Sequence, residues 1–122
     1  MQLASFTIAN GGRKTIGAFV GHCYIDLHAL TGGQLPADML AFLQLGDTGM
    51  HAARAALKQL DAKLDPTGLA KLRGPGGDRY AFAPDEIVLA APVPRPGKIM
   101  HTSCNFTAHL SELTTWKEPE WQ

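Results

Sequence analysis

The stretch QLASFTIANGGRKTIGAFVGHCYIDL, residues 2–27, has the pattern of a three-stranded antiparallel meander. Its small and β-branched residues suit a pleated surface, and two glycine-containing turns divide it into three short runs. Asn10, Gly11 and Gly12 tolerate positive φ at the first turn, and Gly21 with His22 reverses the chain at the second. The sequence therefore predicts strands at residues 2–8, 15–20 and 23–27. Such a meander buries little apolar surface alone and needs a helical cover.

Two helices are predicted to supply that cover. A short helix follows Leu35-Pro36 and ends at Gly46, a residue suited to the position just after a helix. Asp47 or Thr48 can cap a second helix, which Asp65-Pro66 ends because proline cannot continue the hydrogen-bond ladder. Apolar residues recur along this helix at steps of three and four and predict a face packed on the meander. These residues are Met50, Ala53, Leu57, Leu60 and Leu64.

The chain after the second helix changes character. Residues 74–77, Gly-Pro-Gly-Gly, predict a mobile loop, and residues 87–90 form an apolar run typical of a strand. Prolines 92, 94 and 96 make the next segment extended and stiff, which favours a joint between two domains. We therefore expect an α+β domain at 1–90, a proline-rich connector at 91–98, and the beginning of a second domain at 99–122.

Composition excludes several classes of function. Eleven basic and eleven acidic residues cancel, so no excess positive charge points to nucleic acid or an anionic membrane surface. No apolar run approaches the ~20 residues needed to span a bilayer, and the first five residues lack the features of a signal peptide. Cys23 and Cys104 form no paired motif and fit reduced thiols. These features predict a cytoplasmic protein.

His109 and Glu112 are the strongest catalytic candidates in the sequence. Three residues apart on a helix, they project from the same face, about 5–6 Å apart at Cβ. A carboxylate so placed can orient an imidazole and raise its basicity, which makes a general base near neutral pH. Two alternatives stay open: Cys104 as a nucleophile paired with His109, or a zinc site of His101, Cys104 and His109, for which no fourth ligand lies nearby.

The residues around this pair carry a family resemblance. Residues 91–99 read Ala-Pro-Val-Pro-Arg-Pro-Gly-Lys-Ile, and Asn105 and Phe106 precede His109 and Glu112 at fixed spacing. Together with residues 3–6, 17–21, 25–27 and 35–36, they resemble the fumarylacetoacetate hydrolase family. In that family such a segment joins a small N-terminal domain to the catalytic domain. The resemblance covers most of the chain, strongly at 91–112 and weakly between 48 and 80.

The resemblance implies a fold and a chemistry. The fold is a β-meander covered by two helices, then the connector and the first strand and lid turn of a mixed β catalytic domain. The chemistry is metal-dependent cleavage of a carbon–carbon bond in a β-diketo or oxo acid of acylpyruvate type, as in the catabolism of aromatic compounds, or a related decarboxylation or isomerisation. His109 and Glu112 would be catalytic, and Asn105 and Phe106 would contact substrate. Phe106 stands where tyrosine is usual, so substrate identity does not carry over.

The same resemblance implies that catalysis needs more than these residues. The Mg²⁺ or Mn²⁺ of the complete enzyme would be held by glutamates and an aspartate of the later catalytic domain, and none of its ligands is expected in this chain. The complete enzyme would be a homodimer acting on a small oxo acid, whereas the 122-residue chain alone would be inactive. The rival interpretation is a non-catalytic folded module that packs on itself or on a partner.

Overall fold

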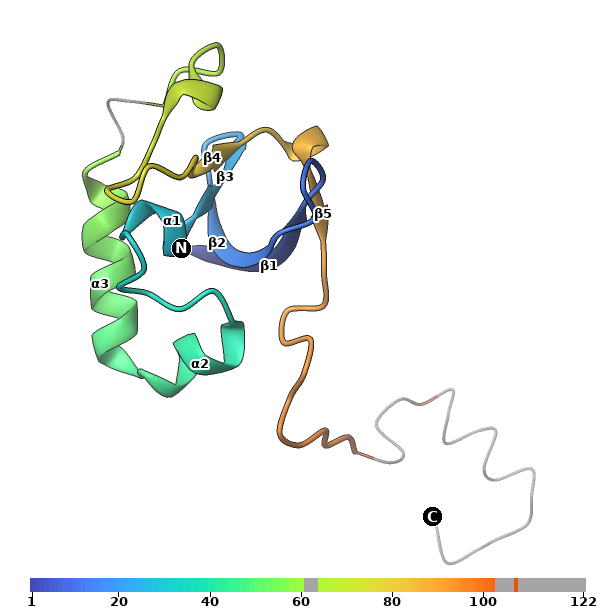
Figure 1. Cartoon of the computed structure of the whole chain (residues 1–122). Helices are drawn as coiled ribbons and strands as arrows, with labels where there is room; N and C mark the ends of the chain where they lie inside the picture. The colour runs from blue at the N-terminus through green and yellow to red at the C-terminus, as the bar shows by residue number, and fades with distance from the viewer. Residues whose placement is uncertain (61–63, 103–106, 108–122) are drawn as a thin grey trace, which may run out of the picture.

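The computed structural model describes residues 1–60, 64–102 and 107 of the chain. Its architecture is α+β: a curled antiparallel sheet of five strands with three α-helices against it (Figure 1). The strands are β1 Gln2–Ile8, β2 Lys14–Val20, β3 Cys23–Asp26, β4 Ala81–Phe82 and β5 Ile87–Leu89. The helices are α1 Leu27–Leu30, α2 Met39–Gln44 and α3 Asp47–Lys58, with single 3₁₀ turns at η1 Leu69–Lys71 and η2 Pro84–Glu86.

The predicted meander is confirmed and extended at both edges. The strand order is β4-β3-β2-β1-β5, and every neighbouring pair is antiparallel. β4 and β5 lie at opposite edges of the sheet, yet only the η2 turn and Ala83 separate them in sequence. A connection this short requires the two edges to approach each other, so the sheet curls into the open ring seen in Figure 1.

The β1–β2 turn forms as its glycines predict. Gly11 and Gly12 have φ values of 99° and 68°, which side chains other than glycine rarely adopt. The Gly12 N–H donates to the Ile8 carbonyl at 3.0 Å, and the Ile8 N–H donates to the Arg13 carbonyl at 2.8 Å. These bonds fix the register that follows, with Phe6 opposite Thr15 and Ala4 opposite Gly17.

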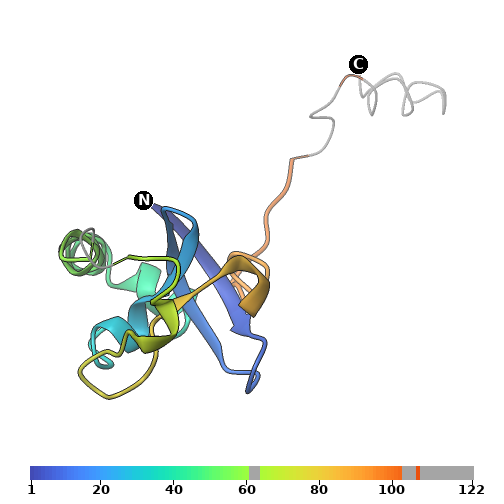
Figure 2. The ribbon, with the colours of Figure 1, turned by 90° about the horizontal axis from the view of Figure 1, so that it is seen from above.

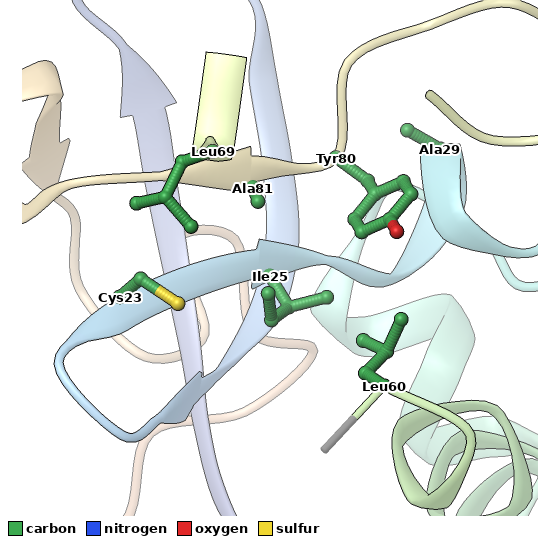
Figure 3. Packing of buried hydrophobic residues seen from close by; sticks show 7 residues of the cluster. All are labelled: Cys23, Ile25, Ala29, Leu60, Leu69, Tyr80 and Ala81. Carbon is green, nitrogen blue, oxygen red and sulfur yellow. The ribbon is translucent and has the colours of Figure 1, made fainter. Parts of the chain in front are cut away.

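The helices cover one face of the sheet (Figures 1 and 2). Two buried clusters lie between them. One joins Cys23 and Ile25 of β3 to Ala29 of α1 and to Leu60, and Figure 3 shows Leu60 and Tyr80 pointing toward Ile25. The other cluster is formed by Ile16, Leu27, Leu35, Met39, Phe42 and Ala53.

The inner face of the curl holds a third cluster. Phe6 and Ile8 of β1 meet Phe82 of β4 and Ile87 of β5, the two edge strands. Gly17 makes this packing possible, because a Cβ built there would lie 2.0 Å from the Ile25 carbonyl oxygen and 2.8 Å from the Phe6 ring. The sheet therefore encloses its own small core in addition to the one it shares with the helices.

Both predicted helices form, with corrections at their ends. Gly46, at φ 59°, follows α2 as expected, but it is also the N-cap of α3, so Asp47 begins the helix and neither Asp47 nor Thr48 caps it. The helix ends at Lys58, well before Pro66. The Leu60 N–H donates to the Leu57 carbonyl at 3.0 Å, an i to i−3 bond that tightens the last turn.

The apolar face of α3 packs against the sheet, as its spacing predicts. Leu57 contacts both clusters that lie between the helices and the sheet, and Met50 contacts the one that contains Ile16. Beyond the end of the helix, Leu60 belongs to the cluster that contains Ile25, and Leu64 packs against it. Residues 74–77, predicted to be a loop, form a turn in which the Gly74 N–H donates to the Asp78 carbonyl at 2.9 Å. Gly74 itself packs directly against the Ala29 carbonyl, which leaves no room for a side chain.

Candidate functional site

The residues predicted to carry catalysis and substrate binding, Asn105, Phe106, His109 and Glu112, lie outside the described residues. So does Cys104, and with it both alternative sites that use this thiol. The described chain leads toward them through Ile99 and Met100, which are 84% and 89% exposed. Residues 99–102 form no strand, although the sequence predicts one to begin there. A strand needs a neighbour to pair with, and no described strand lies beside this segment.

The connector is fastened to the sheet where it begins. The Ala90 N–H donates to the Ser5 carbonyl at 2.9 Å, continuing the β1–β5 pairing by one residue. The Ser5 hydroxyl then donates to the Pro92 carbonyl at 2.7 Å, and Val93 packs against the cluster that contains Ile16 and Met39. This connector clamp holds residues 90–93 against β1, after which the chain runs away from the sheet (Figure 2).

A cavity of about 200 Å³ lies beside the connector clamp. Strands β1 and β2 form one side of it, the Ala37-Asp38-Met39 turn a second, and the connector a third, through Ala90, Pro94 and Arg95. Lys14 of β2 also lines the cavity. Two cationic side chains and one carboxylate thus surround a space that is otherwise mainly apolar.

A buried carboxylate lies on the inner side of the curl. Asp26 has no exposed surface, and its Oδ1 accepts from the Thr15 hydroxyl at 2.9 Å and from the Ala29 N–H at 3.0 Å. Its Oδ2 lies 3.0 Å from Nη1 of Arg13 but is without a well-directed hydrogen bond, so we describe this contact as an ion pair only. Through these contacts Asp26 joins β2, β3 and α1.

A second ion pair connects the segments that precede the two edge strands: Arg79 lies before β4, and Glu86 lies before β5. Two nitrogens of the Arg79 guanidinium donate to the Glu86 carboxylate at 2.7 and 2.8 Å, and its Nε donates to the Ala81 carbonyl at 2.9 Å. These hydrogen bonds lower the pKa of Glu86. The guanidinium also stacks 4.5 Å from the centre of the Phe82 ring. A cavity of about 420 Å³ adjoins Arg79 and Arg13, but both arginines are already paired with carboxylates.

The remaining reactive groups of the described chain do not form a site. Burial raises the pKa of the Cys23 thiol, which donates to the Val20 carbonyl at 3.3 Å, so this cysteine is a poor nucleophile. The part of the chain that the structure describes contains no group of three or more histidines, cysteines or carboxylates able to hold a metal ion. Helices long and apolar enough to cross a bilayer are likewise absent from the described residues.

Sequence reasoning missed the residues that organise this region. Asp26 is the last residue of β3, within the predicted strand, and it is also the N-cap of α1, a helix that the sequence analysis does not predict. Ser5 gives no local signal, because its partner Pro92 lies 87 positions away. Comparison with known proteins adds no assignment: no family model matches the chain. No curated protein matches it either.

Proposed function

We propose that this chain is the N-terminal domain and the start of the catalytic domain of an enzyme similar to the fumarylacetoacetate hydrolases. The observation that carries the proposal is the connector clamp. A proline-rich segment that only linked two independent bodies would need no attachment, whereas here Ser5 and β1 hold residues 90–93 in a defined direction. The segment that bears the catalytic candidates thus starts from a fixed point on a folded support.

The fold is consistent with such a supporting role. The two ion pairs that the structure describes, Arg13–Asp26 and Arg79–Glu86, are structural contacts, and the one described free cysteine is buried. As the family resemblance implies, glutamates and an aspartate of the later catalytic domain would hold Mg²⁺ or Mn²⁺ in the proposed enzyme.

The proposed reaction assigns roles to residues of this chain. His109, oriented by Glu112, removes a proton from the attacking water, and the Glu112 charge favours the imidazolium that results. Asn105 and Phe106 contact a small β-diketo or oxo acid of acylpyruvate type. The proposed enzyme is a cytoplasmic homodimer, and carbon–carbon hydrolysis, decarboxylation and isomerisation of such acids are variants of one enolate chemistry.

A second candidate function is supported by the core of the described domain. The described members of the three apolar clusters all lie between Leu3 and Val93. A domain with such a core can also serve as a non-catalytic module. The two candidates differ in whether residues 105–112 take part in chemistry.

The decisive experiment is metal-loaded hydrolysis of acylpyruvates by the longer protein that the proposal requires. Loss of a general base typically costs ~10²–10⁴-fold in rate, so His109→Ala should lower kcat by that order with metal affinity nearly intact. His101→Ala, an exposed histidine of the same segment, is the matched control and should retain kcat. Full activity of His109→Ala would refute the assignment of the base, and the 122-residue chain alone should show no turnover with Mg²⁺ or Mn²⁺.

A further inference from the structure

We propose that the cavity beside the connector clamp binds a small organic carboxylate with an apolar body. The cavity lies in the described domain, and the proposal does not depend on the catalytic assignment above. Three properties of the cavity support it: its size, the apolar character of its walls, and the cations that line it.

The size of the cavity suits a molecule of about six carbons. Its volume is about 200 Å³, compared with the ~150 Å³ of an engineered apolar cavity that accommodates benzene. The apolar walls come from three separate segments, through Ile16 of β2, Met39 at the start of α2 and Pro94 of the connector. A short aliphatic chain or a single aromatic ring therefore fits better than a hydrated ion or a sugar.

The charges around the cavity select an anion. Lys14 and Arg95 line it, are exposed, and make no ion pair with any residue that the structure describes. The one carboxylate in the wall, Asp38, already accepts from the Ala41 N–H at 3.0 Å. Two unpaired cations against one engaged carboxylate favour a ligand with a single negative charge. The Thr7 hydroxyl, also in the wall, can donate to its second oxygen.

Strand alternation explains why these groups meet. Thr15 turns inward to Asp26, so its neighbours Lys14 and Ile16 project to the opposite face of β2. Thr7 pairs directly with Lys14 across β1 and β2, and directly paired residues share a face. The connector clamp brings Arg95 to the same place. A bound carboxylate would therefore contact the sheet and the connector together.

The test is an NMR titration of the 122-residue chain with hexanoate and with benzoate. We expect saturable shifts confined to amides around Lys14, Ile16, Met39 and Ala90, with millimolar affinity because the ligands are small. Hexan-1-ol, of the same length but uncharged, should bind at least about tenfold more weakly, since one lost charge contact of ~1.4 kcal/mol is a factor of ten.

Substitutions distinguish binding through the two cations from non-specific binding of hexanoate to the protein surface. Lys14→Gln and Arg95→Gln should each weaken hexanoate by about tenfold, whereas Lys71→Gln, an exposed lysine that does not line the cavity, should leave the affinity unchanged. All three side chains are exposed, so unaltered spectra of the free variants will verify folding. Absence of saturable shifts, equal binding of hexan-1-ol, or full affinity of both cavity variants would each overturn the proposal.

Discussion

Asp26 is a buried residue of β3 whose side chain also bonds to β2 and α1. From these contacts we predict how much its removal destabilises the fold. Asp26→Ala removes the N-cap of α1 and leaves the Thr15 hydroxyl and the Ala29 N–H without their buried acceptor. Loss of a cap costs about 0.5–2 kcal/mol, and each buried unsatisfied group costs about 1–3 kcal/mol. We expect the free energy of unfolding, measured with urea, to fall by roughly 2–5 kcal/mol.

Asp38 provides the matched control for this prediction. It caps α2 with the same geometry, accepting from the Ala41 N–H at 3.0 Å, but it is exposed. Asp38→Ala should therefore cost only about 1 kcal/mol, the ordinary value of a cap. Equal losses for the two variants would mean that the contacts of Asp26 inside the curl contribute nothing beyond capping.

Glu86 predicts how stability changes with acid. The hydrogen bonds from Arg79 lower the pKa of Glu86 from its ordinary value of 4.5, so the unfolded chain takes up a proton at higher pH than the folded one. The resulting stabilisation is complete above 4.5 and is lost as pH falls through the lowered value. The side chain is 38% exposed, so solvent screening keeps the effect small.

The corresponding measurement compares wild type with Glu86→Gln in urea at about pH 7 and about pH 3. The wild type should have the larger free energy of unfolding at neutral pH. The difference in this free energy between wild type and Glu86→Gln should become smaller in acid. Asp85→Asn is the control, since Asp85 is exposed and makes no ion pair with another described residue. A difference that stays constant across this range would show that the Arg79–Glu86 pair does not stabilise the fold.

Among the helices, α3 packs on the rest of the domain through one row of apolar side chains, Met50, Ala53 and Leu57. Leu57 contacts both clusters that lie between the helices and the sheet, whereas its neighbour Lys58 is exposed. Because Leu57 is only half-buried, Leu57→Ala should lower the free energy of unfolding by about 2 kcal/mol, the lower end of the cost for a buried leucine, and Lys58→Ala should leave it nearly unchanged. Denaturation midpoints of the two variants decide the matter. Similar midpoints would mean that the helix is not docked through this face.

Elements with a strong local pattern could be predicted from the sequence, and those made by distant contacts could not. β1, β2, α2 and β5 form within about a residue of their expected positions, because alternation, glycine turns and helical spacing are local signals. β4 has two residues, too few for any periodicity. The pairing of β5 with β1 depends on closure of the curl, which no segment encodes alone.

The candidate sites divide in the same way. The helical spacing of His109 and Glu112 can be read from the sequence, but the structure does not describe those residues, so the prediction stands untested. The cavity beside the connector clamp could not be predicted, because its walls come from residues 5–7, 14–16, 37–39, 90, 94 and 95. Only the folded chain brings Lys14 and Arg95 to one cavity.

For the whole molecule, the location of the core predicts independent folding. Among the residues that the structure describes, all members of the three clusters lie between Leu3 and Val93. We therefore expect a chain of residues 1–98 to unfold cooperatively, with the same urea midpoint as the 122-residue chain. Far-ultraviolet circular dichroism can follow both transitions. A lower midpoint or a broad transition for residues 1–98 would show that later residues stabilise the domain.

The strand order also bears on how the protein is made. β1 leaves the ribosome first, yet its second edge is paired by β5, the last strand of the domain. The β1–β2 hairpin can form early, but the cluster that contains Phe6 and Ile8 is complete only when Ile87 is also present. During that interval the nascent chain presents an unpaired strand edge beside exposed aromatic and aliphatic side chains, the kind of surface that chaperones bind and that drives misassembly. Pairing of β5 with β1 covers this edge, and the adjoining Ser5–Pro92 hydrogen bond attaches the connector.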